Sequence, residues 1–353
     1  MRLEDYPTVL WLSQKTPPIS GRGPLNASVS DLMGMRCGGI LVLSFVVLSV
    51  HAWSQKTPPA ATSTAVAPPV TREATTDLAP HAEWAGPAML SNEQIKALIR
   101  QVAEKDIEND RRQRDYTYIE RSEEHKLNGK GEVTSTETKT YEVLEIYGES
   151  VERLIAKNDT PLSEKDAAKE EEKIQKIIDK RKNESDSDRE KRQKKEEKDR
   201  QETREFVTEV AEAYNFNLAG IESLAGRETY VIDAGPRPGF EAHRKEARIL
   251  PKFRFRIWID KAENQWVKVD AECIDTVSFG LFLARFQKGS RILIETSRVN
   301  DEVWLPRHVA VHVDVRLALL KNYNVNEDIT YKDYKKFHTA TRITSVDEVP
   351  DPK

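Results

Sequence analysis

Apolar and polar residues alternate in the second half of the chain, most regularly in two segments. In residues 253–260, "FRFRIWID", one face is formed by Phe253, Phe255, Ile257 and Ile259. In residues 307–315, "RHVAVHVDV", one face is formed by Val309, Val311, Val313 and Val315, and the other by His308, His312 and Asp314. Alternation with a period of two and short connections predicts antiparallel strands that bury one face.

Other segments have the composition of strands separated by turn residues. The pair 116–127 and 132–148 flanks "NGKG", in which Asn128-Gly129 suits the positive φ angles of a tight hairpin turn. The remaining strand-like segments are 151–159, 215–224, 227–235, 265–275, 290–299, 303–315 and 327–338. Together with 253–260 they predict about ten strands in one antiparallel sheet.

Helical patterns occur at two places. Ser91 and Gln94 form a capping box at the start of a helix whose apolar stripe is Ile95, Leu98, Ile99, Val102 and Ile107. Residues 163–205 contain 15 acidic and 15 basic residues, and apolar positions lie mainly near the two ends of 163–214. This pattern predicts a charged helical hairpin whose base packs on the domain and whose tip stands in water.

The elements combine into an α+β fold. We expect a curved antiparallel sheet, a half-barrel, packed against the N-terminal helix. The domain would span residues 89–345, include the hairpin at 163–214 as an insertion, and be followed by a tail at 346–353.

The N-terminal part resembles an export signal. Arg36 precedes the apolar run 39–50, which is too short for a comfortable membrane span, and small residues stand before Gln55. We expect a signal peptide at 33–54 and a disordered Pro/Ala/Thr-rich tether at 55–88. Residues 1–32 would be an upstream stretch that is included because the start codon was assigned too early. The alternative is an inner-membrane anchor formed by an uncleaved 39–50.

Composition and motifs restrict the chemistry. Lys plus Arg (55) nearly balance Asp plus Glu (59), so the whole chain gives no argument for nucleic-acid binding. The two cysteines exclude a disulfide framework, and Cys273 is in phase with core positions. His308 and His312 would be about 13 Å apart on a strand, too far to share one metal ion. No catalytic, metal or cofactor motif is present; a secreted hydrolase remains a third alternative.

The apolar sheet face is the candidate binding surface. Its proposed lipid-lining residues are Phe253, Phe255, Ile257, Ile259, Val267, Val269, Val309, Val311 and Val313. Arg237, in the rigid loop "AGPRPGF", is the candidate contact for an anionic headgroup. Each buried methylene contributes about 0.8 kcal/mol, so such a face could bind acyl chains without a polar motif. The same residues could equally be the core beneath the helices.

The segment "RIWIDKAENQWVKVDAE", followed by "GSRILIETSRVNDEVWLPRHVAVHV", resembles the strand series of bacterial outer-membrane lipoprotein-sorting proteins, the LolA/LolB-like superfamily. The resemblance is carried by Trp258-Ile259-Asp260, by Asp301 and by 303–306. It implies a periplasmic, non-catalytic carrier of lipids or lipidated proteins in a Gram-negative-type envelope, with transient membrane contact. The charged segment 163–214 departs from the simple carriers. It leaves open an envelope scaffold whose helical hairpin docks a protein partner.

Overall fold

The computed structural model describes residues 90–337, apart from 148, 280–283 and 318–320. The predicted upstream stretch, signal peptide, tether and C-terminal tail all lie outside the described residues. Within the described part of the chain, no helix is both long and apolar enough to cross a membrane.

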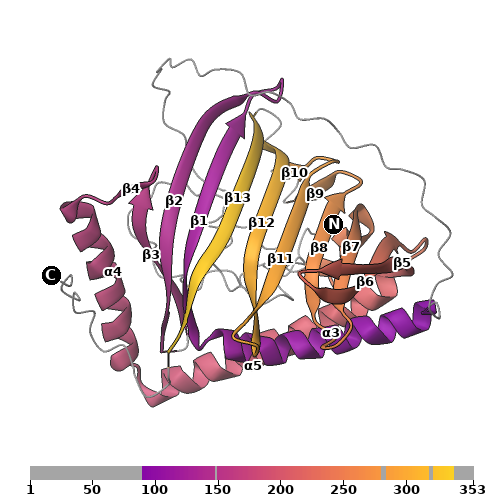
Figure 1. Ribbon diagram of the computed structural model, residues 1–353, viewed down its shortest axis with the longest axis horizontal. Coiled ribbons are helices and arrows are strands. Elements are labelled where there is room, and N and C mark those ends of the chain that lie inside the picture. The colour runs from indigo at the N-terminus through magenta and orange to yellow at the C-terminus, as the bar shows by residue number, and fades with distance from the viewer. Residues whose placement is uncertain (1–89, 148, 280–283, 318–320, 338–353) are drawn as a thin grey trace, which may run out of the picture.

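The fold is built on one open antiparallel sheet of 13 strands (Figure 1). Its order is β4-β3-β2-β1-β13-β12-β11-β8-β7-β6-β5, with β10 paired to β12 and β9 paired to β10. The strands are β1 (Tyr116–Leu127), β2 (Val133–Ile146), β3 (Glu149–Lys157), β4 (Thr160–Pro161), β5 (Tyr214–Leu224), β6 (Arg227–Pro236), β7 (Phe253–Asp260), β8 (Trp266–Cys273), β9 (Val277–Phe279), β10 (Ala284–Phe286), β11 (Arg291–Val299), β12 (Val303–Leu317) and β13 (Lys321–Lys336).

The curved antiparallel sheet with helices confirms the predicted α+β fold. The ten expected strands are all present, and the three additional strands are β4, β9 and β10. Each of these has only two or three residues. A segment that short contains too few positions for an alternation to be recognised in the sequence.

The first described helix is α3 (Asn92–Gln113), which begins at the predicted capping box. Ser91 Oγ accepts from the Gln94 N–H (3.3 Å), and Gln94 Oε1 accepts from the Ser91 N–H (2.8 Å). The predicted apolar stripe is buried along its length. The helix therefore forms where both its local cap and its periodicity favour it.

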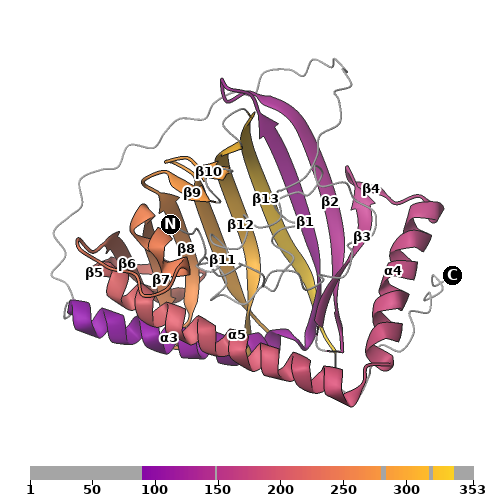
Figure 2. The ribbon, with the colours of Figure 1, turned by 180° about the vertical axis from the view of Figure 1, so that it is seen from behind.

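The charged segment forms two helices, α4 (Glu164–Lys182) and α5 (Asp186–Ala213). They are not packed as a hairpin in water. In Figures 1 and 2, α5 lies beside α3 across one end of the strands, whereas α4 stands next to β3. The cause is that each helix buries its own apolar residues against a different partner. Ile174 and Ile178 of α4 pack on β2 and β3, and Phe206 and Val210 of α5 pack in the main core.

The main core lies between α3, α5 and one face of the sheet. We call this face, which carries Val309, Val311 and Val313, the inner face. The short 3-10 helix η1 (Glu246–Lys252) closes the core near β6 and β7. One apolar cluster unites residues of all three helices with the inner face of β5 to β8, β11, β12 and β13.

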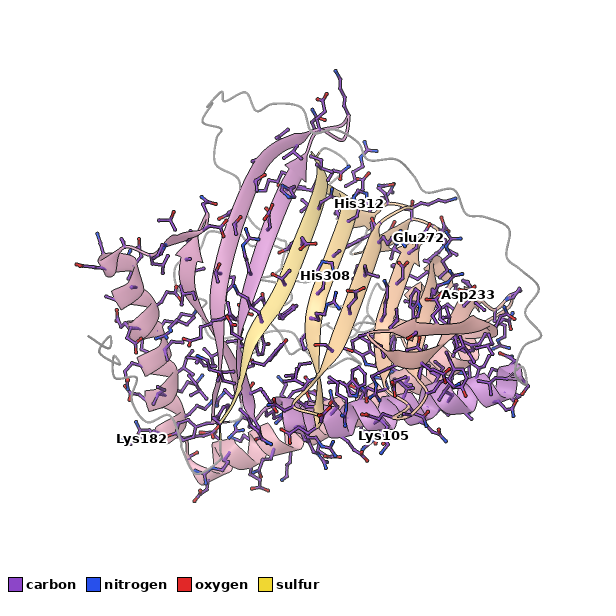
Figure 3. All side chains as sticks on the ribbon, viewed as in Figure 1. Lys105, Lys182, Asp233, Glu272, His308 and His312 are labelled. Carbon is purple, nitrogen blue, oxygen red and sulfur yellow. The ribbon has the colours of Figure 1, made fainter. Side chains whose placement is uncertain are left out.

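The opposite, outer face carries ion pairs between neighbouring strands. Figure 3 labels Asp233, Glu272, His308 and His312, which lie on this face. The pairs are Arg256–Asp233 (2.6 Å), Arg254–Glu272 (2.6 Å), Arg291–Asp270, Lys268–Glu295 (3.0 Å) and His308–Asp328 (2.7 Å). Such a charged surface stays hydrated, so an apolar ligand is more readily accommodated on the inner face.

Candidate binding face

Most of the predicted lining residues lie on the inner face, but many of them belong to the protein's own core. Phe253, Phe255 and Ile259 are buried in the cluster that contains residues of α3, α5 and η1. The ring of Phe255 meets the ring of Tyr214 edge-on, with centroids 5.3 Å apart. Ile257 packs against the same cluster, and Val269 is a member of it. This half of the inner face is therefore covered by the protein itself.

Val267 is placed differently from its predicted neighbours. The register between β7 and β8 shifts there, because Trp258 pairs with Lys268 whereas Ile259 pairs with Trp266. This bulge brings Trp266, instead of Val267, into the main core cluster. A bulge inserts one extra residue and reverses the alternation on one side of it. Strict period-two counting from Val269 could not reveal that change.

The inner face of β12 continues beyond the helices. Asn109 of α3 contacts Trp304, near the start of β12, so the helices cross the strand at that end. Val315 lies eleven residues further on, about 36 Å along an extended strand. Two helices side by side, each about 10–12 Å wide with side chains, span only about 20–24 Å. The far part of β12 and the adjacent part of β13 therefore lie beyond them.

This far part has an apolar surface that is shielded from water. Val313 pairs with Val325, and Val315 pairs with Tyr323, across β12 and β13. Val315 and Val325 are only 9% and 8% exposed. Neither belongs to the apolar clusters that the described residues form, although Val313 packs at the margin of the main one. The geometry therefore distinguishes this surface from the core under α3 and α5.

A polar region adjoins this surface on the same face. The register places Ile329 opposite Ser122, Glu327 opposite Glu124, and Val325 opposite Lys126. The hydroxyl of Ser122 donates to Glu327 Oε1 (2.5 Å), and Lys126 Nζ lies 3.4 Å from Glu124. Further buried polar residues of this region are Glu120 and Lys139. The inner face thus changes from valines on β12 to carboxylates and amines on β1 and β2.

Sequence reasoning missed this polar region. In "YIERSEEHKL" the residues on both faces of the strand are polar, so alternation cannot show which face is buried. Glu120 and Glu124 turn out to face inward, whereas Arg121 bonds Asp159 and Glu123 elsewhere. Only the pairing of β1 with β13 determines which of the two faces of β1 is shielded from water.

Arg237 has a structural role at the end of α5. Its backbone N–H donates to the Ala213 carbonyl (2.8 Å), and its Nε donates to the Glu212 carbonyl (2.7 Å). The guanidinium also lies over the ring of Phe240, 6.0 Å from its centroid. A cation that satisfies the last carbonyls of a helix is a common C-terminal cap. Headgroup contact by Arg237 stays a prediction.

The residues with reactive side chains do not converge. His308 contacts Asp328, and His312 Nδ1 contacts Asn326 Oδ1 at 2.6 Å. Cys273 is fully buried, and burial raises the pKa of its thiol to about 11, so the thiol is protonated at neutral pH. In the described ranges, no group of three or more His, Cys, Asp or Glu side chains is arranged to hold a metal ion.

The motifs that carried the family resemblance hold the fold together. Trp258 Nε1 donates to Glu222 (2.8 Å), and the buried carboxylate of Asp260 accepts from Arg227 (2.7 Å) and from the backbone of the following turn. Trp304 Nε1 donates to Glu263 in that turn (2.9 Å). These residues connect strand ends and turns, which explains why such a motif can mark a fold without marking an activity.

No protein-family model and no curated protein matches the sequence. Several solved structures are similar to its fold. A domain of an outer membrane lipoprotein-sorting protein from Vibrio parahaemolyticus is 13% identical, with a TM-score of 0.29 over 67% of this chain and 93% of that chain. A DUF1329 family protein from Desulfovibrio piger is 11% identical, with a TM-score of 0.28 over 70% and 95% of the two chains. A LolA superfamily protein from Nitrosomonas europaea is 10% identical, with a TM-score of 0.26 over 71% and 97%.

The family named from the sequence is thus among the folds found by comparison. Similarity of this degree assigns no activity or ligand to the chain. The fold assignment rests on the strand order and helix placement described above.

Proposed function

We propose that this protein is a non-catalytic carrier of the bacterial envelope that binds a lipid acyl chain, free or attached to a protein. The binding surface is the far inner face, formed by Val313 and Val315 of β12 with Val325 and Tyr323 of β13. The observation that supports it most is that Val315 and Val325 are shielded yet stand outside the apolar clusters that residues of the described part of the chain form.

The far inner face is apolar on two neighbouring strands. Val313 and Val315 lie about 7 Å apart along β12, and Val325 and Tyr323 lie opposite them on β13. Each methylene withdrawn from water contributes about 0.8 kcal/mol before the cost of association is subtracted. An acyl chain would therefore need no cofactor and no specific polar partner to bind.

The proposal keeps only some of the nine lipid-lining residues predicted from the sequence. Val313 packs at the margin of the main core and borders the proposed surface, whereas Phe253, Phe255, Ile259, Val309 and Val311 are core residues. Export to the periplasm is part of the proposal and depends on the sequence pattern of residues 33–54.

The alternative of an envelope scaffold has less support. In that alternative, the charged helical hairpin at 163–214 would dock a protein partner. In the structure, α4 and the C-terminal half of α5 both bury their apolar residues within the protein's own domain. The remaining N-terminal half of α5 is a charged, mostly exposed helix, which is the usual composition of a solvated surface.

A matched pair of tryptophan substitutions tests the carrier function. Val315→Trp fills the inner face, whereas His312→Trp adds the same ring to the outer face of the same strand. We expect Val315→Trp to weaken binding of a fluorescent palmitoylated peptide at least tenfold, and His312→Trp to leave binding unchanged.

Circular dichroism and urea unfolding establish that both variants fold. If Val315→Trp does not fold, Val325→Phe serves as the second inner-face variant. Equal binding by the folded inner-face and outer-face variants, or no binding by the unsubstituted protein, contradicts the proposal.

A further inference from the structure

The far inner face is more shielded from water than its described neighbours explain. Val315 and Val325 are only 9% and 8% exposed. The strand partners of Val315 flank it within the same layer, with Phe286 on one side and Tyr323 on the other. Neighbours in a sheet stand beside a side chain, and only a second layer about 10 Å away covers it. Among the described residues, α3 and α5 supply such a layer at the opposite end of β12.

The shielding continues over the polar region beside the valines. Glu327 is 2% exposed, and Glu120 and Glu124 are each 6% exposed. These three carboxylates outnumber the amines of the same region, which are the buried Lys139 and the half-exposed Lys126. Because buried charges need compensating charges, the layer that best fits this face is apolar over β12 and positively charged toward β1.

One segment near the N-terminus, outside the described residues, has this combination. Residues 39–50, "GILVLSFVVLSV", contain nine large apolar residues and no charged residue, and Arg36 precedes the run by three positions. The tether at 55–88 and the tail at 338–353 contain large apolar residues only at single, scattered positions. Of these three terminal segments, the run 39–50 is therefore the one whose chemistry matches the far inner face.

The chain between this run and α3 is long enough for the run to reach the surface. Asn92 Oδ1 accepts from the Phe216 N–H (3.1 Å), which places the start of α3 at β5. From there β12 is five strands away, about 24 Å, and Val315 lies about 36 Å along β12 from the helices, which together give about 45 Å. Residues 51–89 have a root-mean-square span of about 35 Å as a flexible chain and reach several-fold further when extended. A tether of this length keeps the run at a high effective concentration near its own domain.

We propose that the apolar run 39–50 docks on the far inner face of its own domain while it is still attached, and that it blocks the acyl-chain surface in the precursor. Arg36 then lies toward the carboxylates of β1 and β13. Cleavage before Gln55 removes the run and opens the surface, so the protein binds an acyl chain only after export. The block of binding rests on the proposed function, whereas the contact between the run and the sheet does not.

Photocrosslinking of the full chain tests the contact. Cell-free synthesis without membranes keeps residues 39–50 attached to the domain. The photoreactive residue p-benzoylphenylalanine replaces either Tyr323 on the inner face or His312 on the outer face of the neighbouring strand. We expect the probe at position 323 to crosslink to 39–50 within the monomer, as mapped by mass spectrometry. The probe at position 312 should give no crosslink to this run.

Binding of a fluorescent palmitoylated peptide tests the block. The full chain should bind the peptide at least about tenfold more weakly than the exported, cleaved protein, because the attached run competes for the surface. The double variant Leu43→Arg, Val47→Arg places two charges in the run, which cannot remain on an apolar surface, and should restore binding by the full chain. The control Thr62→Arg, Thr64→Arg adds the same charges to the tether and should leave binding weak.

The contact is refuted if, in a chain that circular dichroism shows to be folded, the probe at position 323 crosslinks to the tether, to the tail or to no segment instead of 39–50. Equal peptide binding by the full chain and the cleaved protein refutes the block, and so does restored binding by the tether control. A crosslink to 39–50 in a protein that binds no peptide in any form supports the contact and contradicts only the proposed function.

Discussion

Asn109 of α3 replaces a missing strand neighbour of β12, and its removal should destabilise the fold strongly. The pairing of β12 with β13 begins only at His308. Trp304, four residues earlier, instead bonds to Asn109, which is 5% exposed. The Trp304 N–H donates to Asn109 Oδ1 (2.8 Å), and Asn109 Nδ2 donates to the Trp304 carbonyl (2.7 Å). The amide thus supplies the donor and the acceptor of an absent strand.

The cost of Asn109→Ala follows from which groups keep a partner. The Trp304 carbonyl still accepts from Gln113 Nε2 (2.9 Å), whereas the buried Trp304 N–H loses the bond that Asn109 supplied. A buried donor left without a bond costs about 1–3 kcal/mol, and the second lost bond adds about 1 kcal/mol. We therefore expect a loss of about 2–4 kcal/mol of unfolding free energy for Asn109→Ala. Gln113→Ala removes only the redundant bond and should cost about 1 kcal/mol.

Urea unfolding followed by tryptophan fluorescence measures the difference. With a denaturant slope of about 2–3 kcal/mol/M, Asn109→Ala should lower the urea midpoint by about 1 M, and Gln113→Ala by less than half as much. Equal midpoints for the two variants would refute the reasoning, because they would show that the Trp304 N–H does not depend on Asn109.

Three further predictions follow from individual side chains. Because burial raises the thiol pKa of Cys273 to about 11, iodoacetamide at pH 8 should label it slowly in the folded protein and rapidly in urea; equal rates would contradict its burial. Burial alone would raise the pKa of Asp260, but hydrogen bonds from Arg227 and from the turn backbone hold it below its ordinary value of 3.8. Its stabilisation is therefore present above about pH 4 and lost as the pH falls further, so Asp260→Asn should reduce unfolding midpoints at pH 6 more than at pH 3. Arg291→Ala removes a hydrated outer-face pair with Asp270 and should change the unfolding free energy by less than about 1 kcal/mol; a loss above 2 kcal/mol would show that the outer face is not solvated.

The larger elements could be predicted because local signals agreed with the fold. The cap at Ser91 and the stripe from Ile95 onward both favour a helix, and α3 forms there. The alternation in 253–260 and 307–315 predicted strands with one buried face, and the odd-numbered residues do face inward. In these segments, periodicity and tertiary packing require the same conformation.

Other features depend on contacts between distant segments. The bulge at Val267 arises from the pairing of β7 with β8. The local sequence "QWVKV" contains no turn residue that would indicate a bulge. The divergence of α4 from α5 depends on an apolar patch of β2 and β3, which the helix sequences do not contain. The inward direction of Glu120 and Glu124 depends on the register with β13. Each of these requires knowledge of which strand lies next to which.

In the proposed function, the far inner face around Val315 and Val325 holds an acyl chain. Mass spectrometry of lipids extracted from the protein, exported from bacterial cells and purified without detergent, tests it most directly. We predict a stoichiometric acylated species on the unsubstituted protein and on His312→Trp, and its loss from Val315→Trp. A folded protein free of lipid, or one that keeps its lipid with Val315→Trp, would contradict the account.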